Sequence, residues 1–141
     1  MIHDCRFAEL TPTELYAILR LRAEVFVVEQ NCAYLDPDGR DCEPSARHVW
    51  IDEPDRGMIA YLRVLDDGDA RRIGRVVTSP AARSAGHAAL LMEHALSASA
   101  GPWVLDAQSY LVGWYRRFGF SADGAEYLED GIPHTPMQRP R

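Results

Sequence analysis

The segment from residue 83 to residue 88 has the composition of an anion-binding site. It reads Arg-Ser-Ala-Gly-His-Ala and follows a predicted strand that ends near Thr78. A helix predicted to begin there offers free N–H groups and a positive dipole end to an anion. Small side chains let the backbone approach phosphate oxygens, and an adjacent Arg adds a cation. The alternative is an ordinary strand-to-helix turn in which alanine serves helix propensity. The phosphate contacts would come from Arg83, Ser84, Ala85, Gly86, His87 and Ala88.

A second segment, residues 108–120, is rich in aromatic side chains. They stand at positions 110, 114, 115, 118 and 120, around a predicted helix. A Tyr hydroxyl is a suitable proton donor to a leaving thiolate, because the free pKa values of the two groups are about 10 and about 8.5. Leu111, Tyr115 and Phe118 also share one helical face, so packing in the core is the alternative interpretation.

Two patterns that suggest a metal site have the wrong spacing. Residues 36–43 read Asp-Pro-Asp-Gly-Arg-Asp-Cys-Glu, but an EF-hand loop places its Gly later and has no Pro in second position. Cys32, Cys42 and His48 lack the short Cys-x-Cys spacing of a zinc site. We therefore predict no metal. The acidic segment is interpreted either as the lining of a pocket for a cationic substrate or as a solvated loop.

The composition excludes several classes of function. The chain has 141 residues, 47% of them hydrophobic, and a net charge of −6. These values predict a single globular domain, residues 1–141, that does not bind nucleic acid. All 15 Lys and Arg residues are Arg, which excludes a lysine nucleophile. No apolar run approaches the ~20 residues of a membrane span. Three Cys without a CxxC motif fit reduced thiols, so we expect a cytoplasmic protein without a membrane partner.

The elements that must position these residues follow from capping and periodicity. Thr11 and Glu14 form a capping box with Pro at the first helical position, and the apolar spacing predicts a helix to about Glu29. The order of the elements predicts a mixed α/β sheet with helices on both faces. Strands are predicted at 6–9, 47–51, 58–65, 72–78, 103–106, within 120–127 and at 134–138, helices at 85–100 and 110–118, and a loop at 31–46.

Taken together, the two segments resemble the GNAT acetyltransferase superfamily. Its acetyl-CoA motif, Gln/Arg-x-x-Gly-x-Gly/Ala, matches residues 83–88. Its second motif has an Asn-like residue seven before a Tyr and then Gly-Phe, which matches Gln108, Tyr115 and residues 119–120. The bacterial ElaA branch of the superfamily is similar over nearly the whole chain, at residues 21–32, 34–39, 47–48, 73–76, 107–108, 115–120 and 129–134.

The resemblance implies an α/β (α+β) domain of GNAT type. Its mostly antiparallel sheet is flanked by helices and splits in a V between the two central strands. Acetyl-CoA would lie in this V as the co-substrate. The backbone of Val76, Val77 and Thr78 would pair with the pantetheine arm and polarise the thioester carbonyl. The amides of residues 84–88 would hold the pyrophosphate.

Two positions depart from the family pattern. Ser84 replaces a frequent Gly but is small enough for phosphate approach. Gln108, expected among the donor-binding residues, replaces the commoner Asn and offers the same amide group at a longer reach.

The resemblance also implies direct attack by an amine, with Tyr115 protonating the departing thiolate. Because the attacking amine must lose a proton, a general base or a water chain is needed. The candidate bases are Glu29, His48 and His134. Their respective alternatives are a surface carboxylate, a hydrogen-bonded structural His and a solvated hairpin residue.

The acceptor site is expected near the first helix and the last hairpin. Arg22 lies on the apolar face of its helix, and a buried Arg needs a carboxylate partner. It would orient an acid such as Glu29, anchor an anionic substrate group, or form a structural ion pair. Tyr34 and His134 are the other residues assigned to the acceptor.

These inferences predict an N-acetyltransferase that moves the acetyl group of acetyl-CoA to an amine of a small molecule or peptide. A cationic acceptor is expected because segment 29–43 is acidic and contains no Lys. One alternative is a non-catalytic acyl-CoA-binding or protein-interaction module. Another is transfer of a longer acyl chain, held by Val49, Ile51 and Leu62. Homodimers are frequent in the superfamily, but no stretch identifies an interface.

Overall fold

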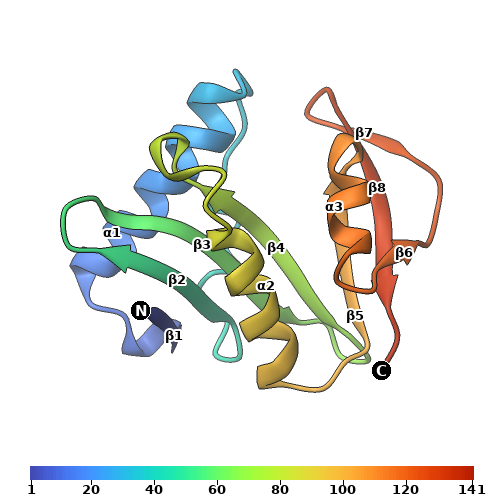
Figure 1. The fold of residues 1–141 in the computed structure, drawn as a ribbon, viewed down its shortest axis with the longest axis horizontal. Helices are drawn as coiled ribbons and strands as arrows, with labels where there is room; N and C mark the ends of the chain where they lie inside the picture. The colour runs from blue at the N-terminus through green and yellow to red at the C-terminus, as the bar shows by residue number, and fades with distance from the viewer.

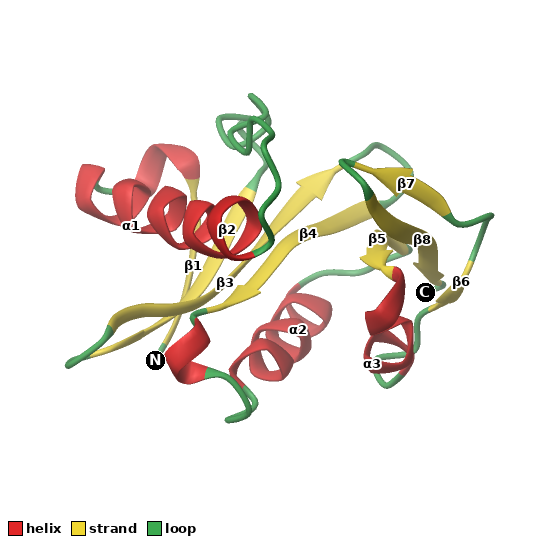
Figure 2. Ribbon diagram, turned by 90° about the horizontal axis from the view of Figure 1, so that it is seen from above, coloured by secondary structure: helices red, strands yellow, loops and turns green.

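The computed structural model describes residues 1–141 as one eight-stranded sheet with helices on both faces (Figures 1 and 2). The strands are β1 (Ile2–Arg6), β2 (Arg47–Glu53), β3 (Gly57–Asp66), β4 (Arg71–Thr78), β5 (Trp103–Gln108), β6 (Ser121–Ala122), β7 (Tyr127–Glu129) and β8 (Ile132–Arg139). The α-helices are α1 (Pro12–Arg22), α2 (His87–Ala98) and α3 (Val112–Arg116), joined by a π-helical segment η2 (Ala23–Glu29) and short 3-10 turns η1 (Phe7–Glu9), η3 (Pro80–Ala82) and η4 (Ser109–Leu111).

The strand order is β1-β2-β3-β4-β5-β8-β6, with β7 paired to β8. Every pairing is antiparallel except that of β4 with β5. The predicted mixed, mostly antiparallel sheet with flanking helices is therefore confirmed. In Figure 2, α1 lies on one face of the sheet, and α2 and α3 lie on the other.

The first helix begins where its capping box predicts. The Glu14 N–H donates to the Thr11 hydroxyl at 3.1 Å, and the Thr11 N–H donates to the Glu14 carboxylate at 2.8 Å. The predicted length to Glu29 is also found, but the last seven residues are π-helical and form η2. A π-helical turn widens the helix and is frequent at functional sites.

Three predicted boundaries are wrong for local reasons. The first strand is residues 2–6 rather than 6–9, because the Arg6 N–H is capped by the Glu9 carboxylate at 2.8 Å and the chain turns there. Helix α2 begins at His87 rather than 85, because Ser84 and Gly86 have left-handed φ values of 70° and 80°. The predicted helix 110–118 is divided between η4 and α3.

Two apolar clusters hold the layers together. Leu91 and Met92 of α2 pack with a larger group that includes Trp103. Ile18 of α1 packs with Trp50 and other residues on the opposite face. Burying each such side chain contributes about 1.5–3 kcal/mol. The larger cluster also contains Val49, Ile51 and Leu62, so the structure places these three in the core and not in a pocket for a long acyl chain.

The sheet splits between β4 and β5, as predicted. These two strands pair only at their first residues, where Arg71 lies opposite Trp103 and Arg72 opposite Val104. Beyond these pairs the strands diverge, which is visible as the opening at the centre of Figure 1. A bulge in β4 contributes, because Gly74 pairs with Arg63 while Val77 pairs with Tyr61, so that one extra residue fits between them.

Candidate functional site

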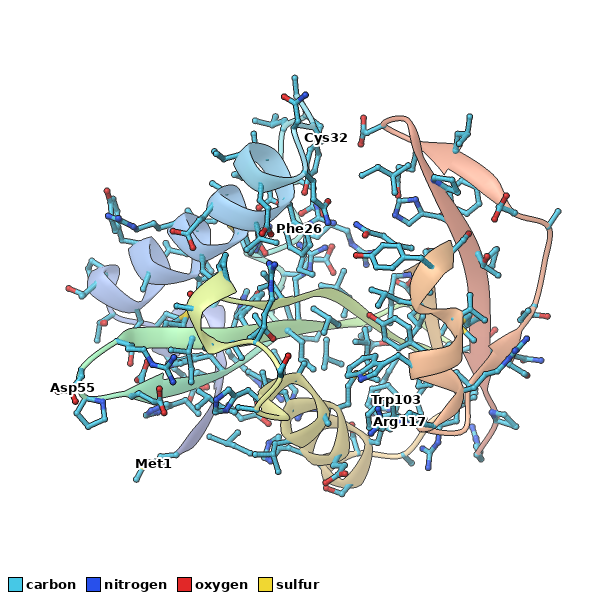
Figure 3. The ribbon with its side chains drawn as sticks, turned by 45° about the horizontal axis from the view of Figure 1, so that its top comes forward. Met1, Phe26, Cys32, Asp55, Trp103 and Arg117 are labelled. Atoms are coloured by element: carbon cyan, nitrogen blue, oxygen red, sulfur yellow. The ribbon has the colours of Figure 1, made fainter.

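A cavity of about 1200 Å³ occupies the opening between β4 and β5. Its walls come from both strands, the start of α2, segment η2, the chain that follows η2, and the β7–β8 turn. Figure 3 shows Phe26 and Cys32 on the η2 side of this opening, and Trp103 and Arg117 beside β5 and α3. The predicted site residues that line the cavity are Glu29, Tyr34, Val76, Val77, Thr78, Arg83, Ser84, Gly86, His87, Ala88, Gln108, Tyr115 and His134. Ala85, Arg22 and His48 do not line it.

The start of α2, where the sequence predicts an anion cradle, lies on the cavity wall. The first four N–H groups of an α-helix have no partner within the helix, and the positive end of the dipole lies with them. Gly86 caps this helix at a φ of 80°, and no atom lies within 4 Å of the place a Cβ would take. Gly is therefore needed at this position for its backbone conformation and not for lack of space.

Arg83 connects the cradle to η2 across the cavity. Its guanidinium donates two hydrogen bonds to the Glu29 carboxylate, at 2.8 and 2.5 Å. The hydrogen bonds from Arg83 lower the pKa of Glu29 below its ordinary value. A carboxylate in this state is a weaker base, so the geometry disfavours the base role expected for Glu29 while the ion pair is intact.

The β4 bulge exposes backbone groups at the divergence of the two strands. Arg75 and Val76 have no register partner on β3, and Arg75 has a φ of 55°, which is unusual for a residue other than Gly. The unpaired backbone of a bulge is free to bond a ligand. Val76 belongs to this bulge, and Val77 and Thr78 follow it on the cavity wall; their backbone contacts with a donor remain a prediction.

Tyr115 packs in the apolar core and also lines the cavity. Its ring belongs to the apolar core and packs edge-on against Trp114 and Phe120, with centroids 4.9 and 6.4 Å apart. The residue also lines the cavity, and its hydroxyl has no hydrogen-bond partner within the protein. Burial raises the pKa of Tyr115 above its ordinary value, so the hydroxyl keeps its proton at neutral pH.

A pair of amides bridges the opening on the η2 side. Gln30 and Gln108 exchange two hydrogen bonds, at 3.3 and 3.1 Å, between the end of η2 and the end of β5. Next to them, the Cys32 thiol donates to the Asp130 carbonyl at 3.4 Å. Sequence reasoning missed Gln30 and Cys32 as bridging residues, because no spacing rule connects residues 78 or 98 positions apart.

The first helix and the acidic segment meet in a buried ionic network. Arg22 is completely buried and bonds Asp36 at 2.8 Å and Asp41 at 2.6 Å. Arg63 shares the same Asp41 oxygen at 3.0 Å. Arg22 is therefore part of a structural ion pair. Because it does not line the cavity, the substrate role expected for it is corrected.

The rest of the network connects the acidic segment to the β4 bulge. Arg63 bonds Asp38 at 2.9 Å, and Arg75 approaches Asp36 at 2.9 Å. The Tyr34 hydroxyl donates to Asp36 at 2.6 Å, and the Arg75 guanidinium lies 5.9 Å from the centre of the Tyr34 ring. Burial raises the pKa of Asp38, but the hydrogen bonds from Arg63 outweigh it and hold the pKa below its ordinary value.

This network changes the interpretation of the acidic segment. Asp36, Asp38 and Asp41 all face guanidinium groups of the same chain. Their charges are balanced internally and do not attract a cationic substrate, which corrects the reason given for a cationic acceptor.

Two acids on the cavity wall have no Arg partner, namely Glu129 and Asp130 of the β7–β8 turn. The arginines of the wall are Arg40, Arg63, Arg72, Arg75, Arg83 and Arg117.

His48 is fully buried behind the network. Its Nδ1 lies 2.7 Å from the Tyr61 hydroxyl and its Nε2 lies 3.0 Å from the Asp41 carbonyl. Because a carbonyl only accepts, Nε2 carries the proton and Nδ1 accepts from Tyr61. Burial lowers the pKa of His48 and keeps the ring neutral. Both nitrogens are engaged and neither faces the cavity, so the base role expected for His48 is corrected to a structural one.

His134 of β8 lies opposite Gln108 of β5 and lines the cavity. Its Nδ1 lies 2.8 Å from the carbonyl of Ile132, and its ring stacks on that of Tyr127. Its Nε2 lies 3.8 Å from the Glu129 carboxylate. The hairpin turn predicted at Asp130 and Gly131 is what returns the chain to this position.

None of the helices combines the length and the apolar character that a membrane crossing requires.

The geometry can be compared with known proteins. Residues 27–140 match the family model described as an acetyltransferase (GNAT) domain. UPF0039 protein Rv2851c of Mycobacterium tuberculosis is 44% identical over 137 residues, which cover 94% of this chain and 88% of that protein. Protein ElaA of Escherichia coli is 41% identical over 146 residues, covering 96% and 94%.

Two solved structures have the same fold over nearly their whole length. The chain is similar to an acyl-CoA N-acyltransferase from Pseudomonas aeruginosa, with a TM-score of 0.92 and 44% identity, covering 99% of both chains. It is also similar to Escherichia coli ElaA, with a TM-score of 0.91 and 39% identity, covering 99% of this chain and 98% of that one.

Proposed function

Because the chain belongs to the GNAT acetyltransferase family and to its ElaA-like branch, we propose that it transfers the acetyl group of acetyl-CoA to an amine. The observation that carries this proposal is a single cavity. It joins the cradle at the start of α2, the bulge of β4 and the unbonded hydroxyl of Tyr115.

The donor would be bound by the α2 side of the cavity. The amides of residues 84–88 would hold its pyrophosphate, and Arg83 would add a cation once it leaves Glu29. The backbone at Val76, Val77 and Thr78 would pair with the pantetheine arm and place an N–H against the thioester oxygen. Such a donor, aimed at the charge that develops in the transition state, often contributes several kcal/mol.

Tyr115 would supply the proton that the departing thiolate needs. Its hydroxyl keeps this proton at neutral pH, and no protein group competes for it. Gln108 would orient the donor or acceptor through its amide, after release from Gln30.

The acceptor we propose is a cationic amine. Glu129 and Asp130, the two wall acids without an Arg partner, lie at the β7–β8 turn, on the side of the cavity formed by η2 and β8. Every other acid of the wall is paired with an arginine. An ammonium group that approaches from this side would meet two carboxylates that no arginine neutralises, which favours a cation at this point.

Thermal unfolding with acetyl-CoA and with free CoA tests the donor site. At about 100 times Kd, a ligand of the native state adds roughly 2.7 kcal/mol, or several degrees for a domain of this size. Gly86→Ala should lose this shift. Gly57→Ala is the matched control, because Gly57 also has a positive φ of 69° and open space around it but lies away from the cavity.

Turnover is then measured as release of the CoA thiol with cationic, neutral and anionic amines. Acetylation of cationic amines is the expected result. Turnover of anionic amines alone would contradict the acceptor class. A clear thermal shift without turnover of any amine would instead support a non-catalytic acyl-CoA-binding module.

A further inference from the structure

The β7–β8 hairpin holds a histidine whose tautomer is set by the backbone. The distance from Nδ1 of His134 to the Ile132 carbonyl is 2.8 Å, and a carbonyl oxygen can only accept. Nδ1 of the neutral ring therefore carries the hydrogen, and Nε2 carries the lone pair. The side chain is 12% exposed and lines the cavity, so this lone pair is open to a substrate.

From this arrangement we propose that His134 is the general base that deprotonates the acceptor amine, and that Glu129 is a positioning residue that stabilises the imidazolium. The inference rests on the proposed function. The Glu129 carboxylate lies 3.8 Å from Nε2, too far for a hydrogen bond but close enough to favour a positive ring. An ammonium nitrogen that approaches from the side of this pair can lie within hydrogen-bond distance of both groups.

The groups that face His134 support a change of charge on its ring. Tyr127 stacks on it with centroids 5.8 Å apart, and burial, together with nearby Asp106, raises the pKa of Tyr127 to about 12, so this neighbour stays neutral. Asp106 on β5 is balanced by Arg72 at 2.6 Å. Gln108, opposite on β5, is uncharged. Glu129 and the adjacent Asp130 are thus the charges without an Arg partner here.

The position of His134 also fits the attack. Trp103, Leu105 and Ala107 of β5 are buried in the core beside α2, so the alternate residues Asp106 and Gln108 face the η2 side. His134 is the register partner of Gln108 and shares this face. Tyr115 approaches from α3 on the other side. Base and acid therefore flank the cavity from opposite faces of the sheet.

The protons balance with these two groups. The ammonium gives one proton to Nε2 of His134, which passes it to solvent. The free amine attacks the thioester carbon, the C–N bond forms, and collapse of the tetrahedral intermediate breaks the C–S bond with the electron pair on sulfur. Tyr115 gives its proton to this thiolate. The second proton lost by nitrogen, relayed through water, restores the Tyr115 hydroxyl.

The decisive variant is His134→Asn. The Asn amide keeps an N–H donor toward the Ile132 carbonyl but has no group at the position of Nε2. We expect kcat near pH 7 to fall by about 100-fold, the low end for loss of a general base, with the affinity for acetyl-CoA unchanged. The deficit should shrink as the pH rises toward the range in which the amine deprotonates by itself. His94→Asn, whose ring bonds Asp4 outside the cavity, is the matched control and should keep wild-type turnover.

Glu129→Gln tests the positioning role. Loss of the carboxylate disfavours the imidazolium, so the pH at which kcat reaches half its plateau should move to lower values, an effect that a merely structural role would not produce. Glu126→Gln removes the same charge from an exposed residue outside the cavity wall and should leave the profile in place. An unchanged profile in both His134→Asn and Glu129→Gln would overturn the proposal while leaving the acetyltransferase function intact.

A measurement without turnover separates this inference from the function. Nitrogen NMR of the resting protein, above the pH of ring protonation, should show His134 with its hydrogen on Nδ1. A ring with its hydrogen on Nε2 would overturn the proposal whether or not any amine is acetylated. The Nδ1–H form, in a protein that turns over no amine, would contradict the proposed function instead.

Discussion

The two walls of the cleft are stabilised by different interactions. On one side, the network of Arg22, Arg63 and Arg75 with three aspartates fastens the acidic segment to β3 and to the bulge of β4. On the other side, β5 and α3 are held by apolar packing around Trp103 and Tyr115. The difference follows from backbone shape. A bulged strand with a non-Gly residue at positive φ needs directional contacts to hold it, whereas a regular strand and helix need only complementary surfaces.

Polar atoms also differ in their roles between the ionic wall, formed by Arg22, Arg63, Arg75 and three aspartates, and the aromatic wall around Trp103 and Tyr115. In the ionic network, each carboxylate is bonded to buried donors, so it contributes to folding. In the aromatic wall, the Tyr115 hydroxyl bonds to nothing in the protein, so it is free for chemistry. Removing one polar group from each wall should therefore give opposite results.

The largest expected effect is on the ionic wall. Asp41→Asn should lower the free energy of unfolding by about 3 kcal/mol or more, because Arg22 and Arg63 lose their shared charged partner while still buried. Urea unfolding measures this loss. Asp69→Asn, an exposed residue without an ion pair, is the control. A loss below about 1 kcal/mol would mean that the network contributes no more to stability than a surface ion pair does.

The next effect is on the aromatic wall. Tyr115→Phe should leave the free energy of unfolding and the affinity for acetyl-CoA nearly unchanged but lower kcat by about 100-fold, in the range for loss of a general acid. Steady-state kinetics and thermal unfolding together check it. If kcat is unchanged, Tyr115 is only a packing residue, and water or the substrate protonates the departing thiolate.

Low pH should weaken the ionic wall but not the aromatic wall. The pKa values of Asp38 and Asp41 are lowered in the folded state, because hydrogen bonds from the arginines outweigh burial. Their contribution to stability is complete above the unfolded pKa of about 4 and is lost as the pH falls below it. Wild-type unfolding free energy should fall in this range with a slope of up to about 1.4 kcal/mol per pH unit for each proton taken up.

The slope in acid should be smaller in a variant that lacks one of these carboxylates. Asp38→Asn, followed by urea unfolding between pH 2 and pH 5, isolates the contribution of one group. Equal slopes in the variant and the wild type would mean that the acids of the network do not govern acid unfolding.

The smallest effect concerns the ion pair that spans the cleft. Glu29→Gln releases Arg83, so the affinity for acetyl-CoA should rise by a few-fold at most, because an exposed ion pair is weak. Calorimetric titration measures it, with Glu24→Gln on the same segment as control. Weaker binding in Glu29→Gln would indicate that Glu29 orients Arg83 for the phosphate instead of competing for it.

The sequence predicts best those features that are local along the chain. The capping box at Thr11 is found as predicted, and the helix predicted to begin at residue 85 begins two residues later, at His87. Both predictions rest on neighbouring residues of the chain. Features that depend on distant partners escaped it. The sequence shows that Asp36 and Asp41 are acidic, but their burial depends on the distant Arg22 and Arg63. The bond between Gln30 and Gln108 likewise forms only when the sheet brings the ends of η2 and β5 together.

The side chains of the cavity wall have a consequence for the protein itself. If the cleft activates an acetyl thioester, as proposed above, any amine beside it would be at risk of acetylation, including amines of its own chain. Here the strong cations of the wall are six arginines, and the chain has no lysine at all. A guanidinium remains protonated at any physiological pH and is a poor nucleophile. The six arginines thus give the cleft its cationic contacts without placing a lysine amine beside the proposed acetyl donor.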